Sequence, residues 1–536
     1  MKNNILPTEM KEELTDLVGS ENFTDSSYET GLYSHDLARI PAPLAVFFER
    51  VPSGIILPQN AMQVLEILRI ARKYEVPVIP RGKGTWALGG AVPQEGGLVI
   101  DTSKLDSISI DKEKRIAYVG AGTVFSDLMS RSSEKGLMVP AYPSSYPGAS
   151  VGGWIAVGGV GIGAYGHGGA SSIYFSLQVV VPDGIYHLGR PEVEDMGFGY
   201  PLSKLLPSSE GTLGVITAAS IKLVKQIDVK NAAFHFPDED SLGLFLHKFA
   251  SSHIPAYHVA FFGMGHLELV EETAGKEAEG ERKKKKEKKD ECGEVNKEKN
   301  RQHETIGRIP ESPGTPTLNY TKILPGHGAV CLVSFLLPEK AASACIEETT
   351  LLASESSGKR LSQDAADYLW SERAYEFRCK RQGTGINMAT GLVPLHNFQK
   401  FTSAFAEAKK SMNLRGGLTG ILVSGHTLDM MPYHLQASSG LDPLVSLSFN
   451  AKMAREFLKL GGTPMGLGLW LACILEMDKE YACKLELMEK VRNAFDPSAI
   501  LNPGKTLSMT TRWGVDVPPA AFQAVSTILE YLRKVV

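Results

Sequence analysis

The chain has few of the features that mark secreted or metal-cluster proteins. Its six cysteines are scattered over 536 residues and none of them forms a C-x-x-C pair. This spacing argues against an iron–sulfur cluster or a zinc site within the chain. A core of this size also needs no disulfide bonds, so we expect a reduced, cytoplasmic protein.

No stretch of the sequence is long and apolar enough to span a membrane. The longest run of low charge, Val151–Gly166, has sixteen residues, and seven of them are glycine. A spanning helix needs about 20 apolar residues, and glycine is a poor helix former. We therefore expect loop and strand in this run. The first residues, Met1–Pro7, do not resemble a signal peptide.

The charge balance gives no sign of a nucleic-acid partner or of a membrane surface. The formal net charge is −4, with 43% hydrophobic and 22% charged residues. These values are those of an ordinary soluble globular protein. A length of 536 residues predicts two or more domains.

Three glycine-rich stretches in the first half of the chain carry the strongest signal. Loop 1 is Pro80–Thr85, loop 2 is Pro143–Gly153 and loop 3 is Ser209–Thr217, and each lies beside apolar, β-branched residues. Glycine reaches positive φ at low cost and lets the main chain approach a ligand closely. Backbone amides in such turns form concave sites for anions. Together the three loops predict a pocket for a long ligand with a diphosphate in its middle.

Periodicity along the rest of the chain predicts alternating helices and strands. Apolar residues at helical spacing in Ala61–Tyr74 are followed by a strand at Val76–Ile79, so loop 1 follows that strand. Other predicted strands are Leu98–Asp101, Ile116–Val119, Leu177–Val181, Val215–Val224, Ala232–Phe236, Val330–Leu336, Gly420–Val423 and Leu444–Phe449. Other predicted helices are Glu9–Val18, Val124–Lys135, Ser241–Ala250, Ala341–Glu355 and Gln399–Ser411.

Residues 276–301 form a low-complexity insertion with eleven Lys or Arg and eight Asp or Glu. A segment this polar buries too little surface to fold, so we expect a disordered excursion over residues 276–315. A docking arm for an acidic partner is the alternative interpretation.

The three loops resemble those of flavoproteins of the vanillyl-alcohol oxidase/PCMH superfamily, and the branch is that of D-lactate dehydrogenase and the D component of glycolate oxidase. Asp183-Gly184 and the tail motif Phe495–Lys505 carry the same resemblance. It implies an α+β fold: a PCMH-type FAD-binding domain of two α/β subdomains at 1–225, and an α+β cap domain with an antiparallel sheet at 226–470. Residues 471–536 would then return to the FAD-binding domain.

The resemblance implies which residues bind the cofactor. Loop 1 would wrap the pyrophosphate, loop 2 would continue the cradle, and loop 3 would hold the adenine end. Covalently flavinylated relatives have histidine where this chain has Thr85, so we expect non-covalent FAD. The implied cofactor-binding residues are Pro80, Arg81, Gly82, Lys83, Gly84, Thr85, Gly89, Gly90, Pro143, Ser144, Ser145, Ser150, Gly152, Gly153, Tyr165, Gly166, Glu210, Gly211, Gly214, Val215, Ile216, Asn502 and Lys505.

The catalytic candidates are less well defined. Arg373, in a W-x-x-R pattern that starts at Trp370, would grip a substrate carboxylate, with Arg378 and Arg381 as alternatives. His426 or His434 would take a proton, and Tyr433 is the alternative.

The sequence of this chain differs from that of the branch at the positions where the branch binds a metal. The branch pattern H-x-G-D-G-N-x-H is replaced by residues 426–434, with histidines eight positions apart, and the glutamate-histidine signature is absent from Gly461–Trp470. Two histidines without a carboxylate make an incomplete site, so we expect no bound metal.

The resulting hypothesis is an FAD-dependent dehydrogenase that oxidises a small 2-hydroxy acid, such as D-lactate or glycolate, by hydride transfer to flavin N5. Because the chain has no cluster motif, the electrons would pass to a separate iron–sulfur or electron-transfer flavoprotein partner. Two alternatives stay open: a flavoenzyme for an apolar or aryl alcohol, and a flavin-binding electron-transfer subunit of a larger complex.

Overall fold

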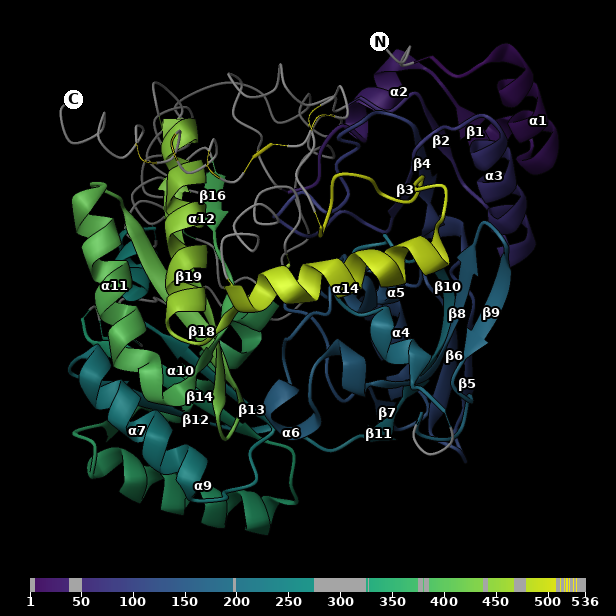
Figure 1. Cartoon of the computed structure of the whole chain (residues 1–536). Helices are drawn as coiled ribbons and strands as arrows, with labels where there is room; N and C mark the ends of the chain where they lie inside the picture. The colour runs from purple at the N-terminus through teal and green to yellow at the C-terminus, as the bar shows by residue number, and fades with distance from the viewer. Residues whose placement is uncertain are drawn as a thin grey trace, which may run out of the picture.

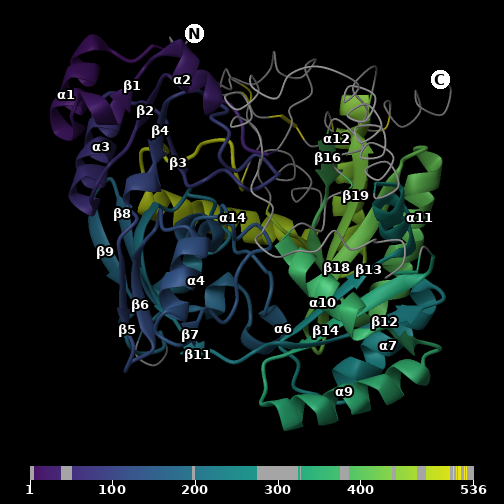
Figure 2. The ribbon, with the colours of Figure 1, turned by 180° about the vertical axis from the view of Figure 1, so that it is seen from behind.

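The computed structural model describes residues 5–37, 51–195, 199–273, 324–325, 327–374, 379, 385–436, 442–466 and 479–507, with a few isolated positions beyond. These residues form two lobes, and helix α14 (Lys479–Phe495) lies across both of them (Figure 1). The view from behind shows the same arrangement (Figure 2). The predicted insertion at 276–301 lies outside the described residues.

The first sheet belongs to the N-terminal lobe and has the strand order β1-β2-β4-β3. Strands β2, β4 and β3 run parallel because helix α3 crosses over between β2 and β3. Helix α3 starts at Asn60, whose side chain accepts a hydrogen bond from the Gln63 N–H, and it buries its predicted apolar face. The elements are α1 (Thr8–Val18), β1 (Phe23–Thr24), α2 (Ser27–Leu32), β2 (Gly54–Ile56), α3 (Ala61–Lys73), β3 (Val78–Arg81) and β4 (Leu98–Asp101).

The second sheet of this lobe has five strands in the order β5-β6-β10-β8-β9, all paired antiparallel. Loops 1, 2 and 3 meet beside these two sheets, where they line one cavity. The elements are β5 (Ile108–Asp111), β6 (Ile116–Gly120), α4 (Phe125–Ser133), β7 (Leu137–Met138), α5 (Val151–Ala156), α6 (Ala164–His167), β8 (Tyr174–Val181), β9 (Gly184–Leu188), β10 (Val215–Lys222) and β11 (Val224–Lys225).

The prediction of loop and strand for Val151–Gly166 is wrong, since α5 and α6 are short helices. The reason lies in the packing of α5. A Cβ at Gly152 would meet the Cβ of Ala121 at 2.6 Å, so the helix sits on the end of the sheet at a distance that only glycine permits. Tertiary contact thus overrides the low helix propensity of glycine here.

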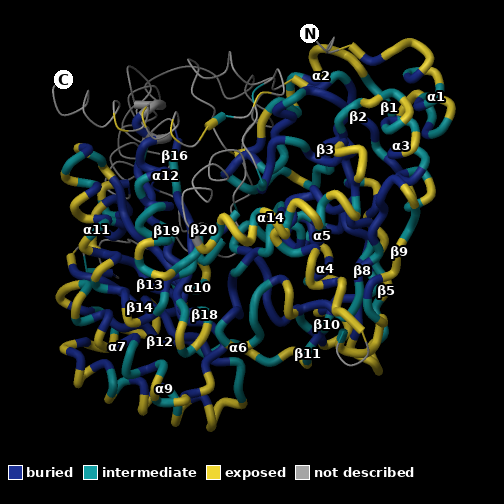
Figure 3. Tube along the Cα trace, in the orientation of Figure 1, coloured by how far each residue is buried: buried dark blue, intermediate teal, exposed yellow. Residues whose placement is uncertain are grey.

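The second lobe is built on a nine-stranded antiparallel sheet, β15-β12-β14-β13-β18-β19-β17-β20, with β16 paired to β19. Helices cover it, and their apolar sides face inward while the exposed positions face solvent (Figure 3). The strands are β12 (Lys230–Phe236), β13 (His258–Phe262), β14 (Ala329–Phe335), β15 (Lys359–Arg360), β16 (Gly385–Met388), β17 (Gly391–Pro394), β18 (Gly416–Ser424), β19 (Thr427–Gln436) and β20 (Thr463–Pro464). The helices are α7 (Glu239–Ser251), α9 (Glu339–Ser354), α10 (Gln363–Ser371), α11 (Phe398–Ser411) and α12 (Asp442–Lys459).

The predicted strand at Leu444–Phe449 is also wrong, because these residues lie in α12. The buried side chains of this helix include Val445, Phe449, Met453 and Phe457, which recur every four residues. Six residues, four of them apolar, fit a strand or a helix equally well, and only the longer window reveals the helical period.

The C-terminal segment joins the first sheet. The Val78 N–H donates to the Ile500 carbonyl at 2.8 Å, and the Asn502 N–H donates to the Val78 carbonyl at 2.8 Å. Leu501 therefore extends the sheet beside β3 in a parallel bridge. The sequence predicted that the tail returns to the N-terminal lobe, and this is where residues 500–502 lie.

The α+β class predicted from the sequence is confirmed by these sheets and helices. Among the described residues, no helix combines the length and the apolar character that crossing a bilayer requires.

Candidate functional site

A cavity lies where the three glycine loops meet the second lobe. It encloses about 1260 Å³, solvent at its mouth included. All three loops predicted from the sequence contribute to its wall. The predicted residues in the wall are Pro80, Arg81, Gly82, Lys83, Gly84, Thr85, Gly90, Pro143, Ser144, Ser145, Ser150, Gly152, Gly153, Glu210, Gly211, Gly214, Val215 and Ile216.

The loops touch one another at glycines where an added Cβ would force a neighbouring side chain to shift. A Cβ at Gly82 of loop 1 would lie 2.2 Å from the Ser150 hydroxyl of loop 2. A Cβ at Gly211 of loop 3 would lie 3.1 Å from Pro80 of loop 1, and Gly211 has a φ of +79°. Main chain from three distant segments thus lines one cavity, and its amides can face a bound anion.

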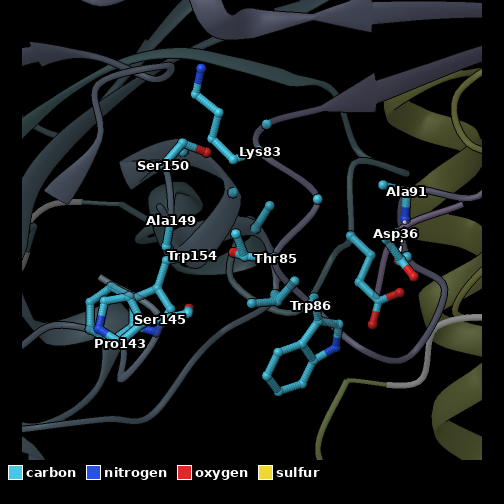
Figure 4. A pocket seen from close by; sticks show the side chains of 18 of the residues that line it. Asp36, Lys83, Thr85, Trp86, Ala91, Pro143, Ser145, Ala149, Ser150 and Trp154 are labelled. Carbon is cyan, nitrogen blue, oxygen red and sulfur yellow. Dashed lines mark hydrogen bonds between the residues drawn. The ribbon is translucent and has the colours of Figure 1, made fainter. Parts of the chain in front are cut away.

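Two buried polar groups in the wall have no hydrogen-bond partner among the described residues. They are the Ser150 hydroxyl and the indole N–H of Trp86. Figure 4 shows Ser150 near Lys83, and Trp86 next to Thr85. Because buried polar groups in proteins almost always have a partner, these two groups indicate a polar ligand in the cavity.

Two cations of loop 1 are held at the edge of the cavity. The Arg81 guanidinium donates to the His35 carbonyl at 2.9 Å and lies 5.1 Å from the ring centroid of Tyr33. Burial lowers the pKa of Arg81 from its ordinary value. The Lys83 ammonium donates to the Ser103 hydroxyl at 3.0 Å. Both side chains supply positive charge beside the cavity wall, and they are anchored through polar contacts to the protein.

Asn502 lies outside the wall and ties Gly90, in the segment that follows loop 1, to loop 3. Its side-chain amide donates to the Gly90 carbonyl at 3.0 Å and to the Glu210 carbonyl at 2.6 Å. Gly89, at a φ of +86°, precedes this contact and is not part of the wall. The C-terminal tail therefore fixes the relative position of two loops of the cavity.

Lys505 is fully buried next to this contact. Its ammonium donates to the Gln94 side chain at 3.2 Å. Burial lowers the pKa of Lys505 to about 8, against the opposing influence of the Asp36, Glu210 and Glu95 carboxylates. Lys505 thus provides a buried positive charge behind the wall, whereas the resemblance implied a residue at the cofactor itself.

The structure separates three predicted residues from this cavity. Tyr165, Gly166 and His426 line a second cavity between the lobes, together with several other histidines. The Tyr165 ring packs 5.9 Å from that of Phe249. The Gly166 N–H donates to the Tyr257 carbonyl at 3.2 Å.

Arg373 lies at the junction of the two lobes, outside the wall of the cavity that the glycine loops line. Its Nε donates to the Tyr142 hydroxyl at 3.1 Å, and its Nη1 donates to the Trp370 carbonyl at 2.8 Å. The guanidinium lies 4.4 Å from the ring centroid of Trp370 and 5.5 Å from that of Tyr146. Among the described residues, Arg373 has no carboxylate partner. Tyr142 and Tyr146 flank the wall residues Pro143, Ser144 and Ser145 of loop 2.

Tyr433 and His434 are neighbours on β19, so their side chains point to opposite faces of the sheet. The Tyr433 hydroxyl is hydrogen-bonded to Nδ1 of His266 at 2.7 Å, and burial lowers the pKa of His266 to about 3. His434 contacts Asn387 at 3.3 Å and lies edge-on to the Phe449 ring at 5.0 Å. Neither residue is part of the cavity wall. The four catalytic candidates therefore do not meet in one place.

The second lobe contributes five wall residues that the sequence analysis did not assign. Met388, Thr390, Asp429, Met431 and Met465 line the same cavity as the loops. Asp429 and Met431 share one face of β19, since side chains two positions apart do so in a strand. Asp429 is the only acidic residue of β19, and this is the sequence signal that could have found it. The alternatives Arg378 and Arg381, and Trp470, lie outside the described residues.

Two family models match this architecture. A model described as an FAD binding domain matches residues 52–189. A model described as the C-terminal domain of FAD linked oxidases matches residues 225–506, more than half of the chain. The chain therefore belongs to the FAD linked oxidases, and FAD is its cofactor.

Two relatives with named activities match part of this chain. The chain is 34% identical over 228 residues to the glycolate oxidase subunit GlcD of Bacillus subtilis. The matched segment is 42% of this chain and 47% of that protein. It is 38% identical over 191 residues to a D-lactate dehydrogenase of Archaeoglobus fulgidus, which covers 35% of this chain and 43% of that one. The chain thus spans less than half the length of these two relatives.

Solved structures share the fold over nearly the whole chain. The 4-ethylphenol oxidase of Gulosibacter chungangensis, in an isoeugenol complex, has a TM-score of 0.73 at 16% identity and covers 94% of this chain and 98% of its own. A p-cresol methylhydroxylase with substrate bound has a TM-score of 0.72 at 16% identity. The match covers 93% of this chain and 96% of that one. At this identity the likeness establishes the PCMH-type fold and nothing of the substrate.

The residues present fit FAD. The loops supply main-chain amides at positions where a Cβ would collide, and the Ser150 hydroxyl and Trp86 indole N–H supply unused donors. Loops 1 and 2 would hold the diphosphate, and loop 3 would lie beside the adenine half. Met388, Thr390, Asp429, Met431 and Met465 of the second lobe would line the rest of the site.

Proposed function

We propose that the protein is an FAD-dependent dehydrogenase that oxidises the CH–OH group of a small 2-hydroxy acid of the D-lactate or glycolate type. The observation that carries the proposal is the single cavity between the glycine loops and the wall residues of the second lobe. The names of the two relatives, a glycolate oxidase subunit and a D-lactate dehydrogenase, support this substrate class. When bound, FAD supplies the two-electron acceptor for such an oxidation.

The chain's own residues bind and orient the reactants. The loop amides neutralise the cofactor's diphosphate, and the anchored Arg81 and Lys83 add positive charge beside it. The methionines of the second lobe exclude water from the substrate side. The guanidinium of Arg373, flanked by aromatic rings, would attract an anionic substrate to the loop 2 side of the cavity.

Thr85 stands where covalent relatives carry histidine, and it lines the cavity. We therefore propose that FAD is held without a covalent bond. The electrons would pass on to a separate acceptor protein. The name of one relative, a glycolate oxidase subunit, is in keeping with such a partner.

A second candidate substrate is a neutral, apolar alcohol, including aryl alcohols. One observation favours it. The described wall residues of the second lobe are three methionines, a threonine and a carboxylic acid, so this side carries no cation within the described residues. An ionised carboxyl here would repel the carboxylate of a 2-hydroxy acid.

One experiment decides between the candidates. The purified yellow holoenzyme is mixed anaerobically with D-lactate, glycolate, benzyl alcohol and a medium-chain aliphatic alcohol, and the flavin absorbance is followed. Bleaching by the hydroxy acids supports the first proposal, and bleaching by neutral alcohols alone replaces it with the second. If dithionite bleaches the flavin and no hydroxyl compound does, both substrate classes fall, and a subunit reduced only through a co-purifying redox partner becomes the better account.

A further inference from the structure

Asp429 is a carboxyl group that the second lobe presents to the cavity from the middle of a sheet. It lies on β19, is 3% exposed, and lines the same cavity as the glycine loops. Its cross-strand neighbours are Ile421 on β18 and Leu392 on β17. Neither neighbouring side chain offers a charge or a hydrogen bond, so the carboxyl is buried in an apolar part of the sheet. Burying such a group is costly unless it is hydrogen-bonded or paired with an opposite charge.

One hydrogen bond orients this carboxyl. The Thr390 hydroxyl donates to Oδ1 of Asp429 at 3.0 Å, and Thr390 is itself 1% exposed and part of the wall. The carbonyl of Thr390 accepts from the Met465 N–H at 2.9 Å, which fixes the threonine. Within the described residues, Thr390 is the one hydrogen-bond partner of the Asp429 carboxyl. Oδ2 is therefore left for a group bound in the cavity.

The other polar and charged groups of the second lobe near β19 are engaged elsewhere. His434 contacts Asn387 on the opposite face of the strand. On α12, the Lys452 ammonium donates to the Ser411 hydroxyl at 3.4 Å, and the Arg455 Nε donates to the Ala451 carbonyl at 3.2 Å. None of these groups pairs with Asp429.

The ionisable residues on the loop side of the cavity are Asp36, Arg81, Lys83 and Glu210. Arg81 and Lys83 are anchored to His35 and Ser103. Burial, opposed only by the bond from Thr390, raises the pKa of Asp429 to about 7. A carboxyl with this pKa is present in both its acid and base forms near neutral pH, which suits proton transfer.

We propose that Asp429 is the proton acceptor for the substrate hydroxyl, with Thr390 as its positioning residue. The inference rests on the proposed function. The O–H bond of the substrate breaks and its proton goes to Oδ2 of Asp429, while the C–O bond becomes C=O. FAD, when bound, would accept the hydrogen on the same carbon together with its two electrons, so atoms and electrons would balance. The role assigned to a histidine from the sequence thus passes to a carboxyl group.

The test measures flavin reduction by rapid mixing, using whichever substrate bleaches the wild-type holoenzyme, between pH 5.5 and 9. For the wild type, the limiting rate should rise with pH to a plateau with an apparent pKa near 7. D429N, which keeps size and shape, should lose at least about 100-fold in this rate and lose its pH dependence. T390V should keep a pH-dependent rate with a displaced midpoint, since the carboxyl remains and only its orienting bond is gone. D16N, at an exposed position on α1, is the matched control.

A second readout needs no turnover. Difference infrared spectra of the holoenzyme between pH 5.5 and 8.5 should contain the C=O band of a buried protonated carboxyl, and D429N should lack it. Flavin occupancy and circular dichroism establish that each variant is folded.

The outcomes separate the two proposals. If D429N reduces its flavin at the wild-type rate, or the infrared band persists in it, the role of Asp429 is overturned while the proposed function stands. If no hydroxyl compound reduces the wild type, the proposed function falls and the catalytic role of Asp429 falls with it, even where the band is present.

Discussion

Replacing Asp429 by asparagine should make the protein more stable, and the gain should depend on pH. The folded state holds this carboxyl with a pKa raised to about 7 by burial, from an ordinary value of 3.8. A raised pKa means that the folded state favours the protonated form. The contribution of the carboxyl to stability is therefore intact below about pH 4 and is lost as the pH rises through 7.

The size of this loss follows from the shift. Three pKa units at about 1.4 kcal/mol each give a penalty of about 4 kcal/mol above pH 7. Asparagine retains the bond from Thr390 and carries no charge, so it avoids the penalty. The free energy of unfolding of D429N minus that of the wild type should grow by about 1.4 kcal/mol per pH unit between pH 5 and 7 and then level off.

Urea unfolding of both proteins at pH 5, 6, 7 and 8, monitored by tryptophan fluorescence, measures this difference. D16N serves again as the control, because Asp16 is exposed and a surface change of this kind moves stability by less than about 0.5 kcal/mol. A difference between D429N and wild type that stays constant across the four pH values would show that this carboxyl is not buried in the way described. The acid–base argument built on it would then have no physical basis.

Four further predictions concern the cofactor and the substrate. G82A should yield a folded protein with little bound flavin, because a Cβ would lie 2.2 Å from the Ser150 hydroxyl, and the flavin-to-protein absorbance ratio measures this. N502A should weaken FAD binding, since it removes two hydrogen bonds worth about 1 kcal/mol each, to the carbonyls of Gly90 and Glu210. An unchanged FAD dissociation constant in a titration of the apoprotein would contradict this role of Asn502. Because Thr85 replaces the linking histidine, acid precipitation should release all flavin into the supernatant, and flavin in the pellet would refute non-covalent binding. R373M should raise the KM for a hydroxy acid about tenfold or more with a smaller change in kcat, whereas the KM for a neutral alcohol should not move.

The three glycine loops that line the cavity could be found from the sequence because their role depends on the main chain. Glycines such as Gly82 and Gly211 stand where a Cβ would crowd a neighbouring loop. The glycines are therefore visible in the sequence before the structure is known. The same local logic predicted the strand and helix preceding loop 1. The return of the tail was predictable from its motif, and its bond from Asn502 to two loop carbonyls needed the structure.

The failures of prediction share one cause, which is dependence on contacts distant in sequence. Helix α5 forms around Gly152 because Ala121 lies against it, and a propensity scale contains no information on that neighbour. His426 and Tyr433 flank Asp429 within one short segment of the sequence, yet only Asp429 reaches the main cavity. Sequence reasoning favoured the histidine because an unperturbed imidazole titrates near neutral pH, whereas a carboxyl does so only after burial.

The placement of Asp429 on the second lobe has a consequence for how the site works. The loops that hold the diphosphate and the strand that carries the carboxyl belong to different lobes, so the distance between cofactor and proton acceptor depends on how the lobes pack. Arg373 contributes to that packing, because it bonds to Tyr142 of the first lobe and stacks on Trp370 of the second. A substitution at Arg373 should therefore affect substrate affinity through charge and the rate through geometry.

R373K retains the charge and loses the planar stacking and the fixed hydrogen bonds. It should accordingly restore the KM that R373M raises while leaving the limiting reduction rate depressed. If R373K restored both parameters, charge alone would account for the residue, and the packing role would be refuted.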